Sequence, residues 1–337
     1  MDNPQLEIVR QSAHTLVCCG DDFALMKKSV DDLYLVFSVL TGVTIHQVNE
    51  DKDILLPTGK AISRAAAAHC LLELKRTAVF LRGINKAISL KLSESQGKPI
   101  SILYAGTGPY GTLIIPLLTL YKPAELMVDL LDINTDSLDA LQKVTNSLEL
   151  SPYIDNVYCT DATTFIVSKH YDIVISETML ACLKSEPQVA IMQNLIPQMG
   201  NSAIFIPEDI SIDAWLTNPR MEQERMLFYE GEKPHFERVY LGNIFSVNKS
   251  NLATDQFKKT IQIPENWEPF NLLKLFTTVR VFEDELLKEN DSSITMPQKI
   301  CDLYVRTINS ADCWYEQGEK PGMCWEYKEE AELEGVK

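Results

Sequence analysis

The stretch "PISILYAGTGPYG", residues 99–111, decides the fold that this sequence predicts. Its first half is apolar and rich in β-favouring residues, which indicates a buried strand. The strand leads directly into a turn that holds Gly106, Gly108 and Gly111. Glycines at a strand-to-helix turn let a ligand approach the backbone closely, and the helix that follows presents free N–H groups. The stretch therefore predicts the first strand of a parallel sheet, with a ligand-binding turn at its end.

The residues after this turn alternate between helix-like and strand-like patterns. Helices are expected at 112–121, 135–150 and 187–199, and strands at 125–131, 156–162, 171–176 and 202–207. Strands that alternate with helices about every 25 residues are typical of a parallel sheet with helices on both faces. We therefore predict an α/β fold with a doubly wound, Rossmann-like sheet over residues 97–207.

Two flanking regions have different patterns. Apolar residues at helical spacing in 31–40 and 61–92 predict an N-terminal helical cap over residues 1–96. Beyond residue 207, β-type runs alternate with turn-rich segments, which predicts an antiparallel, β-barrel-like or sandwich domain over 208–337. These runs occupy 209–216, 238–247, 258–263, 272–282 and 299–308. The charged end, residues 326–337, is expected to fray or to form a solvated helix.

The composition limits the classes of partner. The formal net charge is −16 and no segment clusters Lys and Arg, so we expect no nucleic-acid binding and a cationic small substrate or peptide instead. The eight cysteines show no metal-ligand spacing, which predicts reduced, buried thiols and no metal site. No apolar run approaches ~20 residues and the start lacks a signal-peptide pattern, so we predict a cytoplasmic protein that does not enter membranes.

Two acids follow the next strands. Asp132 ends the second strand, where a carboxylate can accept hydrogen bonds from ribose hydroxyls. Asp161 ends the third strand, where it would lie beside an adenine amino group. A nicotinamide dinucleotide and S-adenosylmethionine both fit this arrangement, and a turn that binds nothing is the third alternative. Pro109 removes an N–H donor that a pyrophosphate would use, which favours S-adenosylmethionine.

The segment "SETMLACLKSE", residues 176–186, follows the fourth strand and carries two more acids. Glu177 and Glu186 lie nine positions apart, at the two ends of a largely apolar loop. A single glutamate after a strand is usually solvated, and Glu186 before Pro187 also suits the start of a helix. The alternative is that both acids face one ligand at the active edge of the sheet.

These features together resemble class I methyltransferases of the protein arginine methyltransferase family. The resemblance covers about residues 70–215 and rests on "YAGTGPYG" (104–111), "LLDIN" (130–134), "CTDA" (159–162) and "SETMLACLKSE". In that family a double-E loop places its second glutamate nine positions after the first. The segment "ELKRTAVFLRGI" (73–84) is also similar to a family helix whose arginine grips the methionine carboxylate of the donor, which implies that role for Arg76.

The resemblance implies S-adenosylmethionine as the cofactor, together with a set of site residues. The implied cofactor-binding residues are Arg76, Gly106, Thr107, Gly108, Asp132, Ile133, Asp161, Ala162 and Glu177. The implied substrate-binding residues are Glu177, Met179 and Glu186, with Glu177 and Glu186 as the catalytic pair. A homodimer is implied by the same resemblance.

The two acids suit the chemistry of a guanidinium group. A guanidinium is planar, permanently charged and a poor nucleophile, because its lone pairs are delocalised. Two carboxylates can hold it and turn one nitrogen toward the sulfonium methyl of the donor, and one of them can pass on the released proton. We expect the apolar residues between the acids to exclude water and so strengthen both ion pairs. These residues are Met179, Leu180, Ala181 and Leu183.

Departures from the family pattern indicate a rebuilt substrate side. Tyr104 replaces the acid that often begins the glycine motif, and the family's N-terminal aromatic helix has no clear counterpart. The family's Thr-His-Trp loop is replaced by "SSITMPQKI" (292–300), with Met296 and Pro297 at the His and Trp positions. None of the five histidines has a clear claim to that place, and His69 is expected to be packed.

We therefore predict N-methylation of a free guanidino compound, most simply L-arginine, as in bacterial free-arginine methyltransferases of natural-product pathways. The alternatives are a protein arginine methyltransferase that acts on an arginine-containing peptide, and an N- or O-methyltransferase with another acceptor. A binding scaffold without activity and a dehydrogenase are the further alternatives.

Overall fold

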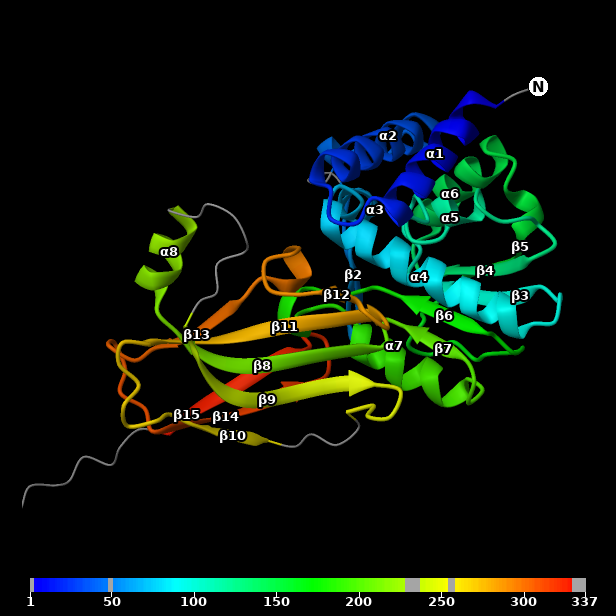
Figure 1. Cartoon of the computed structure of the whole chain (residues 1–337). Coiled ribbons are helices and arrows are strands. Elements are labelled where there is room, and N and C mark those ends of the chain that lie inside the picture. The colour runs from blue at the N-terminus through cyan, green and yellow to red at the C-terminus, as the bar shows by residue number, and fades with distance from the viewer. Residues whose placement is uncertain (1–2, 48–50, 228–236, 254–257, 329–337) are drawn as a thin grey trace, which may run out of the picture.

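The computed structural model describes residues 3–47, 51–227, 237–253 and 258–328. Figure 1 shows two lobes: helices and a parallel sheet form one, and antiparallel strands form the other. The frayed or helical end predicted over 326–337 falls mostly outside the described residues, and its first three residues belong to a strand. Among the described residues, no helix is both long and apolar enough to cross a bilayer.

A five-stranded parallel sheet forms the centre of the first lobe and confirms the predicted doubly wound α/β fold. Its strands, in spatial order, are β5 (Ile154–Cys159), β4 (Leu126–Asp132), β3 (Ile100–Ala105), β6 (Ile173–Ser176) and β7 (Ile204–Ile206). The apolar runs become strands here because the sheet is covered on both faces, and nearly every side chain of β3, β4 and β6 is buried.

The order of the strands reverses beside β3. The chain builds β4 and β5 on one side of β3 and then crosses over to place β6 on the other side. Ala105 pairs with Leu131 of β4 and with Ser176 of β6. The turn after Ala105 therefore lies beside Asp132 and Glu177. A crevice opens at the carboxyl ends of parallel strands at such a reversal, so the topology alone brings the glycine turn and two acids to one edge.

The region before β3 is helical, as predicted. It contains α1 (Pro4–Cys18), α2 (Phe23–Thr41), the 3₁₀ helix η1 (Ile45–Gln47), α3 (Arg64–Cys70) and α4 (Leu74–Glu94). The sequence supplies side-chain caps for three of these helices: Asn3, Asp22 and Ser63 each accept a hydrogen bond from a first-turn N–H group. Such caps satisfy donors that have no partner within the helix.

The prediction of one continuous helical stretch over 61–92 is wrong at residues 71–73, where α3 ends and α4 has not begun. Glu73 is the N-cap residue of α4. The hydroxyl of Thr77 donates to the carbonyl of Leu71 at 2.9 Å, which satisfies a carbonyl that the break leaves without a helical partner. The break matters because it turns the start of α4, with its polar residues, toward the edge of the sheet.

A hairpin that the sequence pattern did not reveal lies between α2 and α3. Its strands β1 (Ile54–Leu56) and β2 (Gly59–Ala61) pair antiparallel around a turn at residues 57–58. The helix predicted over 112–121 shrinks to α5 (Ile115–Leu118). All four side chains of α5 are buried, so packing rather than helical periodicity sets its apolar pattern.

The helices predicted over 135–150 and 187–199 are present as α6 (Thr135–Ser147) and as α7 (Gln188–Leu195) with the 3₁₀ helix η4 (Ile196–Gln198). The 3₁₀ helices η2 (Ser151–Tyr153) and η3 (Ala181–Leu183) were not predicted. Asn134 caps α6 by accepting a hydrogen bond from the N–H of Ser137.

The second lobe is antiparallel, as predicted, and consists of two sheets. One contains β8 (Asp209–Thr217), β9 (Val239–Asn248), β11 (Leu272–Phe282), β12 (Glu285–Leu287) and β13 (Gln298–Asp302). The other contains β10 (Lys259–Gln262), β14 (Ser310–Glu316) and β15 (Gly322–Lys328), of which β14 and β15 were not predicted. The helices α8 (Pro219–Leu227) and η5 (Ser293–Thr295) were not predicted either. The rings of Phe245 and Tyr315 lie 4.9 Å apart and join the two sheets in one core.

The cysteines are free thiols, and Cys182, Cys301 and Cys313 are buried. Cys18 and Cys159 are exposed, so the prediction of buried thiols is wrong for these two. Within the part of the chain that the structure describes, no three or more Cys, His, Asp or Glu side chains cluster as metal ligands would.

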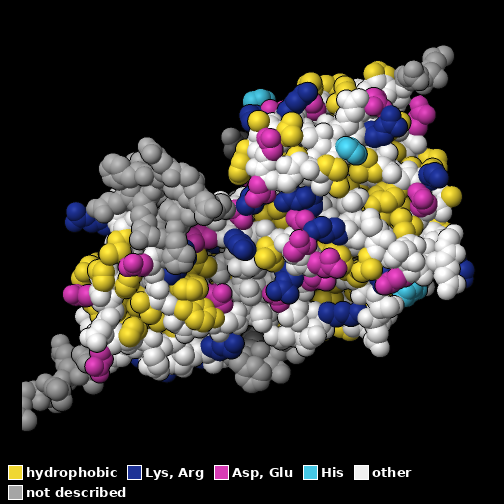
Figure 2. All heavy atoms as spheres, in the orientation of Figure 1, with side chains coloured by type: hydrophobic (Ala, Val, Ile, Leu, Met, Phe, Trp, Pro, Cys, Tyr) yellow, Lys and Arg dark blue, Asp and Glu magenta, His cyan; other side chains and the backbone are white. Residues whose placement is uncertain are grey.

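Helix α4 joins the two lobes. It packs against β11 and β12, and Figure 2 shows basic and acidic side chains gathered where the lobes meet. Arg82 pairs with Glu285 at 2.9 Å and Lys86 with Asp284 at 2.6 Å. Gly83 lets the helix approach the sheet, because a Cβ at this position would lie 2.5 Å from Cγ1 of Val281. The lobes are therefore held as neighbours by close packing with ion pairs around it.

Gly83→Ala should lower the melting temperature by roughly 2–10 °C, because overpacking a close contact costs about 1–3 kcal/mol. Differential scanning fluorimetry measures the change. Ser93→Ala, in the exposed last turn of the same helix, is the control and should change the melting temperature by less than about 2 °C. An unchanged or higher melting temperature in Gly83→Ala would contradict the close approach, since alanine is the better helix former.

Candidate active site

A cavity of about 420 Å³ opens at the carboxyl ends of β3, β4 and β6. This volume lies in the range of small-molecule and cofactor sites. The cavity collects every residue that the sequence assigned to the site. These are Arg76, Gly106, Thr107, Gly108, Asp132, Ile133, Asp161, Ala162, Glu177, Met179 and Glu186.

The glycine turn forms one wall of the cavity and requires its glycines. Gly106 and Gly108 have φ of 80° and 60°, and a Cβ on Gly106 would lie 2.5 Å from Cγ2 of Thr178. The N–H of Gly108 donates to Oδ2 of Asp132 at 2.8 Å, and Thr107 Oγ1 donates to the same oxygen at 3.4 Å. Asp132 is thus the acid that fixes the shape of the turn.

Asp132 also retains capacity for a ligand. Its Oδ1 accepts a hydrogen bond from the N–H of Asn134 at 2.8 Å. Burial raises the pKa of Asp132, and the backbone hydrogen bonds of Asn134 and Gly108 oppose that rise. A carboxylate has about four acceptor positions, so hydroxyl groups of a ligand can still bind to it.

Asp161 and Ala162 line the same cavity from the loop after β5. Oδ1 of Asp161 accepts from the N–H of Thr163 at 2.8 Å, which fixes the carboxylate within its own turn. Asn194 of α7 donates to the carbonyl of Ala162 at 2.9 Å and ties the loop to the helix. This wall is therefore preorganised by hydrogen bonds from its own loop and from α7.

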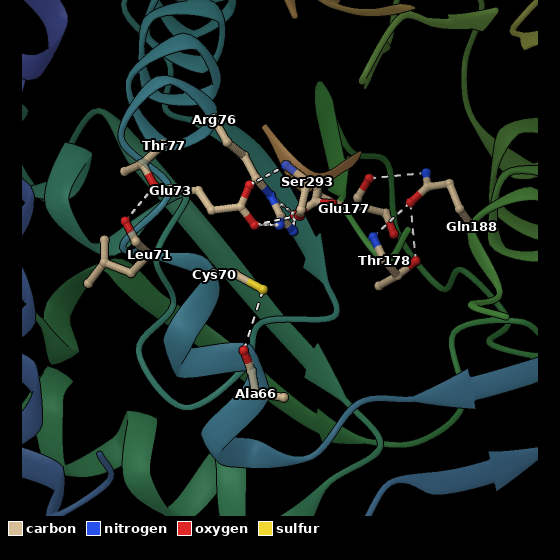
Figure 3. Close-up of polar contacts among 11 residues, drawn as sticks. Ala66, Cys70, Leu71, Glu73, Arg76, Thr77, Glu177, Thr178, Gln188 and Ser293 are labelled. Atoms are coloured by element: carbon tan, nitrogen blue, oxygen red, sulfur yellow. Dashed lines mark hydrogen bonds and ion pairs between the residues drawn. The ribbon is translucent and has the colours of Figure 1, made fainter. Parts of the chain in front are cut away.

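Residues Ser176 to Glu186 are called the double-E loop below, and Glu177 is its first acid. The side chain of Glu177 is 7% exposed and accepts hydrogen bonds from Nε and Nη2 of Arg76, the first at 3.1 Å. Nη1 of Arg76 donates to Glu73 at 2.9 Å (Figure 3). The other oxygen of Glu177, Oε1, is buried and has no hydrogen-bond partner among the described residues. Glu177 therefore binds a guanidinium on one oxygen and leaves the other available.

Glu186 closes the loop at its other end. It is 5% exposed, and within the described part of the chain no hydrogen bond or ion pair satisfies its carboxyl group. Burial, and then the charge of Glu177, raise the pKa of Glu186 to about 8. The carboxyl is therefore mostly protonated at pH 7 and ionises when a cation comes to lie beside it.

Gln188 holds Glu177 in place from the start of α7. It is fully buried, and its Oε1 accepts from the N–H of Thr178 at 2.8 Å while its Nε2 donates to the carbonyl of Ser176 at 3.1 Å. The side chain thus binds the backbone on both sides of Glu177, as Figure 3 shows for Thr178. Sequence reasoning missed this residue, because a glutamine at the start of a helix is not by itself a functional signal.

The rest of the double-E loop is strained and held from three directions. Cys182, Leu183 and Ser185 have φ of 55°, 55° and 69°, a region that side chains other than glycine rarely adopt. The N–H of Cys182 donates to Oγ1 of Thr277 in β11 at 3.0 Å. The N–H of Ser185 donates to the carbonyl of Pro321 at 2.7 Å, and its carbonyl accepts from the N–H of Lys60 in the hairpin at 2.9 Å. Backbone strain of this kind persists where the surroundings fix it.

The apolar residues of the loop do not all exclude water. Met179 and Leu183 are 1% exposed, as the prediction requires. Leu180 is 37% exposed, so the prediction that it shields the acids is wrong.

Glu73 and Ser293 are two further residues of the cavity that lie outside the predicted set. Glu73, at the break before α4, accepts hydrogen bonds from Arg76 and, at 2.7 Å and 2.6 Å, from the N–H and hydroxyl of Ser293. The segment in the position of the family's Thr-His-Trp loop thus reaches the cavity with Ser293, whereas Met296 is 52% exposed. His69 is exposed and lines the cavity, so the prediction that it is packed is wrong.

The fold and the cavity define a Rossmann-like α/β architecture with an antiparallel β lobe and a ligand-sized site at the edge of the parallel sheet. No protein-family model matches the chain, and no curated protein matches it in sequence. Solved structures, by contrast, match the chain in three dimensions. The PRMT1 enzyme–prozyme heterotetrameric complex of Trypanosoma brucei with AdoHcy has 12% identity and a TM-score of 0.50, covering 78% of this chain and 93% of its own. PRMT6 has 11% identity and a TM-score of 0.53, covering 78% of this chain and 99% of its own. These likenesses show the fold.

Glu186→Gln should stabilise the protein more at pH 8.5 than at pH 5. As the pH rises from about 5 to 8 the unfolded chain ionises this glutamate, whereas the folded chain keeps its proton, so wild-type stability falls. Glutamine cannot ionise and so removes that loss. The melting temperature of Glu186→Gln minus that of the wild type should be at least about 3 °C higher at pH 8.5 than at pH 5. The exposed Glu149→Gln is the matched control. An equal difference at both pH values would contradict the raised pKa.

Proposed function

We propose that this protein transfers a methyl group from S-adenosylmethionine to a guanidino nitrogen, most simply that of free L-arginine. The observation that carries the proposal is the pair of buried carboxyl groups in one cavity. Oε1 of Glu177 is buried without a hydrogen-bond partner among the described residues, and Glu186, 5% exposed, lines the same cavity. A buried acceptor without a partner is costly, and a cation with several N–H donors removes that cost at Glu177 and pairs with Glu186.

The residues that would hold the donor fit it. Asp132 can accept from ribose hydroxyls, Asp161 lies on the wall where an adenine would bind, and Arg76 is a buried cation able to pair with the donor's carboxylate. When bound, the donor supplies an activated methyl on a sulfonium. The T. brucei PRMT1 structure contains AdoHcy, the demethylated form of this donor, which supports the assignment.

The chain's own residues would do three things in the reaction. Glu177 and Glu186 bind and orient the guanidinium plane, so that one nitrogen faces the methyl group. Their charge draws positive charge away from that nitrogen in a site from which Met179 and Leu183 exclude water. After the N–C bond forms and the C–S bond breaks, the nitrogen loses a proton. Glu186 is suited to accept it, because it is ionised once the cation is bound and lines the same cavity.

Free L-arginine is favoured over a peptide by the lining of the cavity. Of the described residues that form it, Ser293 alone comes from beyond residue 191, and residues 56–77 supply a wall from the hairpin to α4. The N-terminal region thus covers the site, as a small-molecule pocket requires. The net charge of −16 suits a cationic substrate of either kind.

The proposal extends to a cytoplasmic homodimer that works in small-molecule biosynthesis. Its support is the resemblance to the protein arginine methyltransferases, one of which was solved as a heterotetrameric complex. Light scattering on the purified protein tests the oligomeric state.

Mass spectrometry of the products tests the activity. We expect methylated L-arginine, and Glu177→Gln or Glu186→Gln should each lower kcat/KM by roughly 10²–10⁴-fold, because each removes charge that acts in the transition state. Glu149→Gln is the control for loss of a glutamate charge. Methylation of a Gly-Arg-rich peptide alone would replace the free-arginine proposal with the peptide alternative. Near-wild-type rates in both variants would contradict the role of Glu177 and Glu186 in holding the guanidinium.

Binding of the guanidinium should release protons near neutral pH. At pH 7 Glu186 is mostly protonated, and a cation beside it lowers its pKa, so close to one proton leaves on binding. Isothermal titration calorimetry of L-arginine in two buffers of different ionisation enthalpy counts the protons. The number of protons released for each L-arginine bound should fall toward zero at pH 9. Proton uptake on binding, or release that does not change with pH, would contradict the arrangement.

A further inference from the structure

The hairpin β1–β2 is fixed against the second acid of the double-E loop. The N–H of Lys60 donates to the carbonyl of Ser185 at 2.9 Å, one residue before Glu186. Gly59 has φ of 133°, and a Cβ on it would lie 2.8 Å from the same carbonyl oxygen. Hairpin and loop therefore touch backbone to backbone, and the side chains of the hairpin are held at a set place relative to Glu186.

The base of the hairpin is anchored to the start of α3. Oδ1 of Asp53 accepts from the N–H of Ser63 at 2.8 Å, and Asp51 accepts from the guanidinium of Arg64 at 3.2 Å and from the N–H of Ala65 at 3.1 Å. Two aspartates that precede β1 thus tie the base of the hairpin to the start of α3. The arrangement is rigid enough to position a charged pair.

The hairpin region carries such a pair, and the lysine of the pair lines the cavity. Lys60 lines the cavity together with Glu177 and Glu186, and its Nζ lies 2.6 Å from Oδ2 of Asp53. The two side chains are 32% and 34% exposed, so a solute can reach both charges. Glu186 is within the electrostatic range of both. After burial, Glu177 and Arg76, the largest influences on the pKa of Glu186 are Lys60, which lowers it, and Asp53, which raises it.

We propose that Lys60 and Asp53 bind the α-carboxylate and the α-ammonium of a free amino acid whose guanidinium lies between Glu177 and Glu186. This rests on the proposed function and names its substrate class. A zwitterion carries the two charges that this ion pair offers, so each member exchanges its partner for an opposite charge of the substrate. An arginine within a peptide has neither charge. The pair therefore selects free amino acids over residues of a chain.

Substrate analogues combined with variants test the assignment. Agmatine lacks the carboxylate, 5-guanidinopentanoate lacks the ammonium, and Nα-acetyl-L-arginine amide lacks both charges. In the wild type, kcat/KM for L-arginine should be about 10- to 100-fold higher than for each analogue, because this is the range that one hydrogen bond to a charged group contributes. Lys60→Met should lower kcat/KM for L-arginine to near the wild-type value for agmatine. It should change kcat/KM for agmatine by less than about twofold. Asp53→Asn should do the same with respect to 5-guanidinopentanoate.

Lys52→Met is the matched control, because it removes the same charge from an exposed lysine beside the hairpin that does not line the cavity. It should leave all four values unchanged. An equal loss on L-arginine and agmatine in Lys60→Met would show that Lys60 only supports the loop, and would overturn the inference. Wild-type activity equal on all four compounds would overturn it while leaving the proposed function intact. Failure of every guanidino compound would overturn both.

Discussion

The buried contact between Arg76 and Glu177 is the interaction on which the rest of the site depends. It joins α4 to the end of β6, far apart in the sequence, inside a cavity where an unpaired charge is costly. Glu73 and Glu186 line the same cavity as this pair, so three buried or half-buried glutamates and one arginine lie together there. Acids outnumber cations there, and the molecule accommodates the excess by keeping Glu186 protonated. A cationic ligand would restore the balance, which is why the arrangement favours binding a guanidinium.

The support of this acid cluster explains the architecture around it. The double-E loop adopts backbone conformations that cost about 1–3 kcal/mol per residue, and the parts of the molecule that hold it come from different regions. Thr277 belongs to the β lobe, Pro321 precedes its last described strand, and Lys60 belongs to the hairpin. Gln188 fixes the first acid from α7. The β lobe and the N-terminal cap are therefore parts of the site rather than appendages to the sheet.

The features that the sequence predicted are those set by local pattern or by the rules of parallel sheets. The strand order brings three segments to one edge of the sheet. They are the end of the apolar run before Gly106, Asp132, and the loop that begins at Glu177 and ends at Glu186. The features that sequence missed depend on contacts between distant segments. Glu73 meets Ser293 across 220 positions, and no local pattern marks either residue. The break before α4 and the exposure of His69 follow from the same packing, which periodicity does not encode.

A crystal structure of the protein with S-adenosylhomocysteine and L-arginine tests the central claim most directly. The account predicts the substrate guanidinium between Glu177 and Glu186, with nitrogens within about 3.2 Å of both carboxylates and one nitrogen facing the sulfur. A guanidinium bound elsewhere, or two glutamates that point apart into solvent, would contradict it.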